Sequence, residues 1–150
     1  MQAYGNSISA IVLDISKPLD SFENSVTALR HLCSQLFHRG AKALIIGGDF
    51  QLELQPSFLD VTGPYALGRP SKHDYWDRHS LLVDLMCTFG LHAANTFNNQ
   101  ELPQTRIPWG KCRKDGTQID YFLVSSSLQG SCAASGKRIF RSDHVSIWGA

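Results

Sequence analysis

ALIIGGDFQ, residues 43–51, is the stretch of this sequence that decides the fold. Its first four residues are apolar and two glycines follow, which is the pattern of a buried strand whose carboxyl end opens into a loop. Asp49 comes directly after the glycines, which let backbone or a ligand approach closely, as at many catalytic strand ends. An aspartate after glycine is also ordinary turn chemistry, so both interpretations stay open.

The segments before this stretch predict a strand and a helix. Residues 8–15 are mostly apolar and β-branched, which favours a buried strand that cannot continue through Pro18. A helix is expected from a capping box at Asp20 and Glu23 to Gly40, because apolar residues recur between them at helical spacing. The predicted order up to residue 49 is therefore strand, helix, strand.

The segments after it predict a loop, a second helix and more strands. Glycine and proline residues between 56 and 70 indicate an irregular loop rather than a domain linker. A helix is expected from an N-cap at Asp77 to Gly90, and a strand starts at Leu91. Further short strands are expected at residues 105–109, 117–124 and 145–148.

Length and composition limit the class of protein. With 150 residues, 43% hydrophobic and 18% charged, the chain is expected to form one globular domain. It has neither a run of about 18 apolar residues nor a secretory signal, so an intracellular protein outside the membrane is expected. The four cysteines lack zinc-binding spacing and are interpreted as free thiols or small core residues. The histidines and aspartates at 73, 74, 77 and 79 are interpreted as a polar loop and helix start rather than a metal site.

Positive charge is concentrated in the C-terminal third of the chain. The net charge is +1, but residues 106–141 hold seven Lys and Arg against two Asp, a net charge of +5. Such an asymmetry suits a polyanion such as a nucleic-acid backbone, because neutralised phosphates release counterions. A solvated basic face without a partner explains it equally well.

Two further motifs place polar groups at strands. Asp120 interrupts the apolar stretch 118–124, and a buried carboxylate needs a partner: an arginine such as Arg106 or Arg138, backbone donors, or a histidine N–H. Asp143 and His144 precede the apolar strand at 145, where neighbours in an extended chain point to opposite sides. One can then bind a metal while the other faces a scissile phosphate, although Asp-His is also common in surface turns.

In this order, GDFQ (48–51), IDY (119–121) with VS (124–125), and SDH (142–144) resemble the second half of the endonuclease/exonuclease/phosphatase superfamily. The stretch from Asn95 to Trp109 is similar to the retrotransposon-type endonucleases of this superfamily. The chain also resembles its apurinic/apyrimidinic-type endonucleases, so both types remain open. The resemblance implies an α/β (α+β) fold, the second half of a two-layer or four-layer α/β sandwich with mainly antiparallel sheets. It also implies an endonuclease that uses Mg²⁺ or Mn²⁺ to cleave DNA or RNA.

The resemblance assigns roles by position. Asp143 and Asp49 would hold the metal, and Asp49 would also orient or deprotonate the attacking water. His144 would stabilise developing charge or assist the attack, while Asp120 would accept its ring N–H. Substrate-binding roles are expected for Gln51, Arg106 and Trp109.

Other parts of the family's site are altered or missing. The family also uses an Asn and a metal-binding Glu from its first half, so residues 1–150 are expected to be a C-terminal half-domain. Asp14 and Glu23 are poor replacements for that glutamate, and Gln51 stands where the family has Asn. Two functions therefore remain: a truncated metal-dependent endonuclease, or an inactive half-domain that binds nucleic acid or a partner such as the missing half.

Overall fold

A computed structural model of the chain describes residues 7–15, 19–70, 73–100, 102–128, 133–138 and 142–149. Short 3₁₀ helices lie at Ala94–Thr96, Arg113–Asp115 and Ser126–Leu128. The helices and strands, in chain order, are β1 (Ile8–Asp14), α1 (Leu19–His38), β2 (Ala43–Asp49), α2 (Tyr75–Phe89), β3 (Leu91–Ala93), β4 (Asp120–Ser125), β5 (Ala133–Arg138) and β6 (Val145–Gly149).

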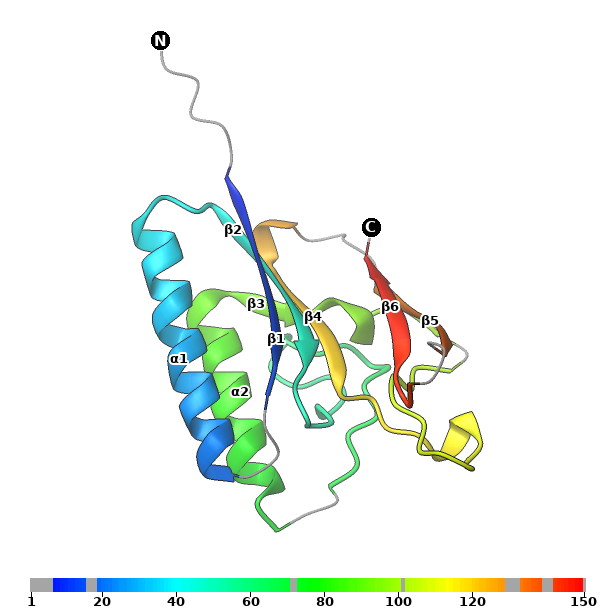
Figure 1. Ribbon diagram of the computed structural model, residues 1–150. Coiled ribbons are helices and arrows are strands. Elements are labelled where there is room, and N and C mark those ends of the chain that lie inside the picture. The colour runs from blue at the N-terminus through cyan, green and yellow to red at the C-terminus, as the bar shows by residue number, and fades with distance from the viewer. Residues whose placement is uncertain are drawn as a thin grey trace.

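A four-stranded sheet in the order β1-β2-β4-β3 forms the centre of the fold (Figure 1). β4 pairs antiparallel with both β2 and β3, whereas β1 and β2 are parallel. The sheet is therefore mixed rather than purely antiparallel. β1 and β2 are parallel because α1 returns the chain to the end of the sheet where β1 begins. β5 and β6 form a separate antiparallel pair.

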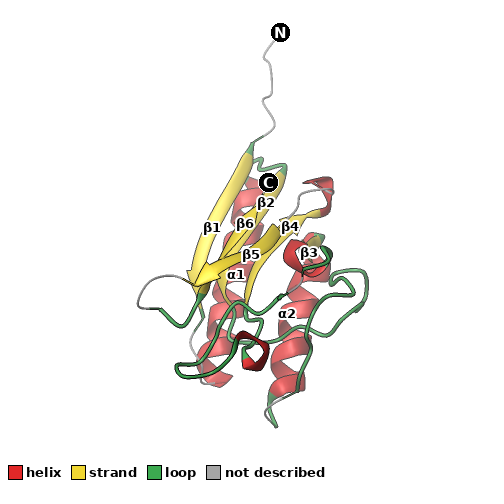
Figure 2. Cartoon of the chain, turned by 90° about the vertical axis from the view of Figure 1, so that its right-hand side faces the viewer, coloured by secondary structure: helices red, strands yellow, loops and turns green. Residues whose placement is uncertain are grey.

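The layers match the expected α/β sandwich. α1 and α2 lie side by side on one face of the four-stranded sheet, and the β5–β6 pair lies on its opposite side (Figures 1 and 2). Alternation along the strands explains the two faces, because Leu44 and Ile46 point toward the helices while Ile45 packs on the other side with Phe122 and Val124.

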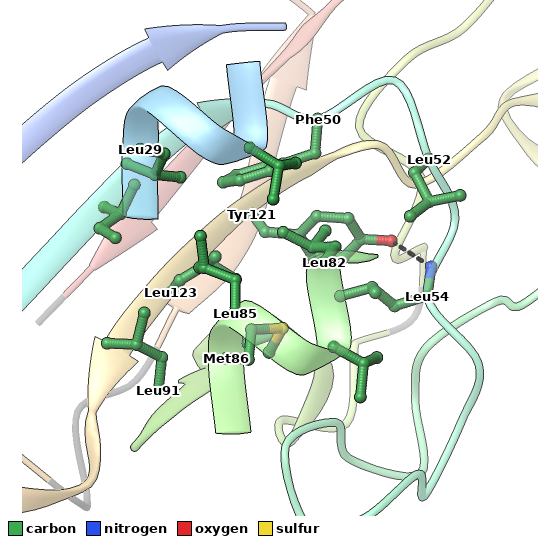
Figure 3. Close-up of a cluster of buried hydrophobic side chains, with 14 of the residues drawn as sticks. Leu29, Phe50, Leu52, Leu54, Leu82, Leu85, Met86, Leu91, Tyr121 and Leu123 are labelled. Atoms are coloured by element: carbon green, nitrogen blue, oxygen red, sulfur yellow. Dashed lines mark hydrogen bonds between the residues drawn. The ribbon is translucent and has the colours of Figure 1, made fainter. Parts of the chain in front are cut away.

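The main core lies between the helices and this sheet (Figure 3). Phe22 of α1, Leu85 of α2 and Leu123 of β4 are completely buried, and each large apolar side chain buried in this way contributes about 1.5–3 kcal/mol. The ring of Tyr121 is buried with them, and its hydroxyl accepts a hydrogen bond from the N–H of Leu54 at 2.9 Å. The core thus also fixes the loop that follows β2.

Both helix starts differ from the sequence-based expectation. α1 begins at Leu19, so Asp20 is inside the helix rather than at its cap. α2 has Asp74 rather than Asp77 as its N-cap, and the carboxylate of Asp74 binds Arg78 at 2.9 and 2.7 Å instead of capping the backbone. Gly90 ends α2 as expected, with φ +60° in the left-handed region.

Several smaller expectations can be compared with the structure. Residues 50–70 are irregular, as expected for residues 56–70, whereas β5 was not predicted. Cys33 is buried in the core, Cys87 and Cys112 are exposed free thiols, and Cys132 lies outside the described residues. None of the helices in the described ranges is long and apolar enough to cross a membrane.

Candidate active site

Two aspartates meet where β2 ends and β4 begins. Asp49 is the last residue of β2, Asp120 is the first of β4, and the antiparallel register pairs them directly. Paired residues on neighbouring strands point to one face of a sheet, here the face away from the helices. Gly48 is required just before this point, because a Cβ there would collide with the carbonyl oxygen of Leu13 in β1.

His144 joins these aspartates from the turn that leads into β6. Its Nδ1 lies 3.2 and 3.1 Å from Oδ1 and Oδ2 of Asp120, and its Nε2 lies 3.7 Å from Oδ2 of Asp49. One ligand atom from each of the three residues lies within 4.8 Å of the others. The structure therefore brings together residues from three distant segments into an Asp-Asp-His group that could bind a metal.

The partner of Asp120 is the histidine ring, one of the alternatives considered from the sequence. The backbone around Asp120 is also fixed, because the N–H groups of Ile119 and Asp120 both donate to Thr105 Oγ1 at 3.0 Å. Asn95 Nδ2 donates to the carbonyl of Asp120 at 3.1 Å. Thr105 and Asn95 are buried and position Asp120, a role that the sequence did not predict for them.

Residues 105–107 connect β4 to the turn that carries His144. Arg106 forms single β-bridges with Thr117 and with His144, in place of the strand expected at 105–109. On the same segment, the N–H of Ile107 donates to the carbonyl of Asp143 at 2.6 Å, and the N–H of Val145 donates to the carbonyl of Thr105 at 2.6 Å. These bonds fix Asp143 and His144 relative to Asp120.

Asp143 lies beside the cluster but has a cationic partner of its own. Nε of Arg106 lies 2.7 Å from Oδ2 of Asp143, and this hydrogen bond holds the pKa of the carboxyl below its ordinary value. The other oxygen, Oδ1, lies 3.8 Å from Nε2 of His144. Arg106, expected to bind substrate, therefore pairs with Asp143, which was expected to bind metal.

The two central aspartates have raised pKa values. Burial is the largest cause for both, since it disfavours the ionised form. For Asp49 the neighbouring charge of Asp120 adds to the increase, while the hydrogen bond from the Gln51 backbone opposes it. For Asp120 a side-chain hydrogen bond from Thr105 and the charge of His144 lower the pKa in part.

Gln51 orients Asp49 directly. Its N–H donates to Oδ1 of Asp49 at 2.8 Å, and its amide Nε2 donates to Oδ2 at 2.5 Å. Gln51 has a φ of +50°, in the left-handed region. Trp109, the other residue expected to bind substrate, is 65% exposed in a surface turn, and its contact with substrate stays a prediction.

A pocket of about 340 Å³ adjoins the cluster through Gln51 and Arg106. Its wall also contains Arg69 and Glu53, and Glu53 is buried with Oε1 accepting from Arg69 Nη2 at 3.1 Å and from the N–H of Gln118 at 3.0 Å. Because both partners hold this oxygen inside the fold, Glu53 has a structural role in the pocket wall.

The polar cluster at the start of α2 has a structural role too. His79 is buried, and its Nε2 accepts a hydrogen bond from the N–H of Gln55 at 3.2 Å. Burial also lowers the pKa of His79, so the neutral ring fits its surroundings. Within the described ranges, the metal-compatible group is the one at Asp49, Asp120 and His144.

The basic segment 106–141 is described in part. Lys111 and Lys114 are exposed, whereas Arg113 donates to the carbonyl of Leu102 at 2.9 Å. Arg141 and the side chains of Lys137 and Arg138 lie outside the described residues.

Neither a protein-family model nor a curated protein sequence matches this chain. Solved structures do match. The 3′ phosphatase NExo from Neisseria, bound to a product DNA hairpin, has a TM-score of 0.65 at 14% identity, over 94% of this chain and 60% of its own. An AP endonuclease from Archaeoglobus fulgidus has a TM-score of 0.61 at 16% identity, over 95% and 61%.

A third match carries the name of the superfamily. An endonuclease/exonuclease/phosphatase family protein from Bacteroides thetaiotaomicron has a TM-score of 0.51 at 12% identity, over 92% of this chain and 47% of its own. This chain thus spans about half the length of the solved proteins that it matches. The resemblance seen in the sequence motifs is confirmed at the level of the fold.

Proposed function

We propose that this chain, which has the fold of the endonuclease/exonuclease/phosphatase superfamily, is a divalent-metal-dependent phosphodiester hydrolase of endonuclease type that acts on nucleic acid. The observation that carries the proposal is the contact of His144 with Asp120, beside Asp49, at one end of two packed sheets. A carboxylate that can activate a nucleophile and an oriented imidazole are groups that can catalyse hydrolysis of a phosphodiester.

Asp120, His144 and Asp49 would have different roles in the reaction. A carboxylate can only accept, so Asp120 holds the proton of His144 on Nδ1 and leaves Nε2 facing Asp49. The scissile phosphate would lie against Nε2, and a ring that carries a second proton there would donate a hydrogen bond to the phosphate and stabilise its developing negative charge, while Asp120 holds Nδ1–H. Asp49 would accept the proton of the attacking water, a role favoured by its raised pKa.

The donor set fits a hard divalent cation. Carboxylate oxygens are the ligands that Mg²⁺ and Mn²⁺ prefer, and the cluster offers them together with an imidazole within 4.8 Å. We assign the metal to Asp49 of this group and to Asp143 beside it, whose Oδ1 is left open by Arg106 and lies 3.8 Å from Nε2 of His144. The bound ion would supply charge stabilisation on the phosphate and the leaving oxygen.

The substrate class and the half-domain organisation are part of the same proposal. One neighbour is an AP endonuclease and another was solved with product DNA, and both support a nucleic-acid substrate.

On the outer face of β1, Ile8 is 53% and Val12 is 89% exposed, an apolar surface that a further part of the domain would cover. An inactive half-domain that binds nucleic acid or that partner is the second candidate, favoured by the Arg106–Asp143 ion pair, which occupies an expected metal ligand.

Cleavage assays on two substrates test the function. The purified chain is incubated with Mg²⁺ and either supercoiled plasmid or a duplex with one abasic site, beside His144→Ala and His38→Ala. His38 is exposed at the end of α1, so His38→Ala makes the same substitution at a position away from the site. Metal-dependent cleavage that His144→Ala loses and His38→Ala keeps would support the enzyme. Equal cleavage by wild type and His144→Ala would leave the binding role as the better candidate.

A further inference from the structure

Three aspartates stand in one row across three neighbouring strands. The parallel register of β1 and β2 pairs Asp14 with Asp49, and the antiparallel register of β2 and β4 pairs Asp49 with Asp120. The N–H of Ile15 donates to the carbonyl of Asp49 at 2.9 Å, which holds the end of β1 beside this row. The position of Asp14 is therefore set by the sheet and not by a loose loop.

Asp14 lies on the same face of the sheet as the cluster. Along β1 the partly buried Ile11 and Leu13 alternate with the exposed Val12 and Asp14, so Asp14 is on the face away from the helices. Its charge also acts on Asp49, where it adds to the causes that raise the pKa of that carboxyl. Register and electrostatics thus agree that the two carboxylates are neighbours.

Two other carboxylates of the site already have hydrogen-bond partners. Both oxygens of Asp120 contact Nδ1 of His144, and Oδ2 of Asp143 is held by Arg106. Asp14, in contrast, is exposed beside Asp49. Neighbouring strands lie about 4.8 Å apart, so one cation with Mg–O distances of about 2.1 Å can contact carboxylates on both.

We propose that Asp14 is a further metal ligand, which joins Asp49 in binding Mg²⁺ or Mn²⁺ in this site. The inference rests on the proposed function for the location of the site, but it concerns binding of the metal and not cleavage. It gives the chain a ligand from β1 at the edge of the cluster, where a cation relieves the repulsion between two adjacent carboxylates.

Titration with Mn²⁺ alone, followed by the electron paramagnetic resonance signal of the free ion, tests this ligand. Wild type is compared with Asp14→Asn, with Asp14→Glu, and with Glu23→Gln as the matched control. Glu23 is an exposed carboxylate of α1, so its variant loses the same charge elsewhere. We expect the Kd for Mn²⁺ to rise at least about tenfold in Asp14→Asn, to rise less in Asp14→Glu, and to stay unchanged in Glu23→Gln.

Circular dichroism of each variant verifies that it is folded before titration. Absence of saturable Mn²⁺ binding by wild type, or equal affinities of Asp14→Asn and Glu23→Gln, would overturn the assignment. Asp14-dependent binding by a chain that cleaves neither substrate would support the metal ligand and contradict the proposed hydrolase. Cleavage that depends on His144, with Mn²⁺ affinity unchanged in Asp14→Asn, would support the hydrolase and overturn the role of Asp14.

Discussion

Oδ2 of Asp120 lies 3.1 Å from Nδ1 of His144, which joins the first residue of β4 to the residue that precedes β6. The contact couples the two sheets at the site, because the central sheet contributes the carboxylate and the turn before β6 contributes the ring. It also selects the tautomer with the proton on Nδ1, since an ionised carboxylate only accepts hydrogen bonds. The orientation of His144 thus depends on a residue 24 positions earlier.

Asp120→Asn tests that dependence. The neutral amide cannot stabilise a doubly protonated ring as the carboxylate does, and its NH2 group can donate to Nδ1, which would leave the ring with a single proton on Nε2. We expect metal-dependent cleavage to fall by roughly 10²–10⁴-fold, the usual contribution of acid–base groups, and the nitrogen-15 shifts of His144 to report the other tautomer. Asp77→Asn, an exposed aspartate of α2, serves as the control. Near-normal cleavage by Asp120→Asn would contradict this role.

The raised pKa of Asp49 predicts a stability effect with a definite sign. Because the folded state holds the Asp49 proton more tightly than the unfolded chain, stability falls as pH rises from the unfolded value of 3.8 through the folded pKa. Asp49→Asn removes that penalty, so we expect its free energy of unfolding at pH 7 to exceed that of wild type by about 0.5–2 kcal/mol, while cleavage is lost. Urea unfolding of wild type and variant at pH 7 and below pH 3.8 measures this difference in the free energy of unfolding, which should disappear at the lower pH. A destabilised variant at pH 7 would oppose this reading.

Arg106 and Asp143 give the opposite pH dependence. The pKa of Asp143 is lowered by its hydrogen bond to Arg106, so the pair stabilises the fold above pH 3.8 and that contribution is lost as pH falls through the folded pKa. The pair is partly exposed, so we expect Arg106→Gln to cost no more than about 1 kcal/mol at pH 7. Urea unfolding at pH 7 and at low pH should show the loss shrinking on acidification. A loss that is independent of pH would point to packing rather than charge.

The Asp-Asp-His group of the candidate site could be predicted because its motifs coincide with strand ends. Asp49, Asp120 and His144 each stand where a polar residue meets an apolar run, and such positions are visible in a single sequence. Asn95 and Thr105 could not be assigned, because their role is to bind the backbone around Asp120, and only the packed structure shows which backbone they reach.

Features that the sequence misplaced or did not record have physical reasons. Asp77 has the sequence of an N-cap, but α2 begins one turn earlier at Tyr75, where the Asp74 carboxylate pairs with Arg78 rather than with the helix backbone. The parallel pairing of β1 follows from the crossover of α1, a topological choice that local patterns do not record. The proximity of Asp14 to Asp49 was missed for the same reason, since strand register joins residues 35 positions apart.

The exposed apolar row on β1 predicts self-association that one charge can suppress. Val12 is 89% exposed beside the 53% exposed Ile8 on an edge strand, a surface that invites contact with other chains. Since the side chain of Val12 is so exposed, Val12→Lys should shift sedimentation equilibrium toward the monomer while changing the free energy of unfolding by less than about 0.5 kcal/mol. Thr27→Lys adds the same single charge at an exposed position of α1 and should leave association unchanged, which shows whether the effect depends on the position or only on the charge. If wild type is monomeric at high micromolar concentration, or if both lysine variants behave alike, the outer face of β1 is not an adhesive surface.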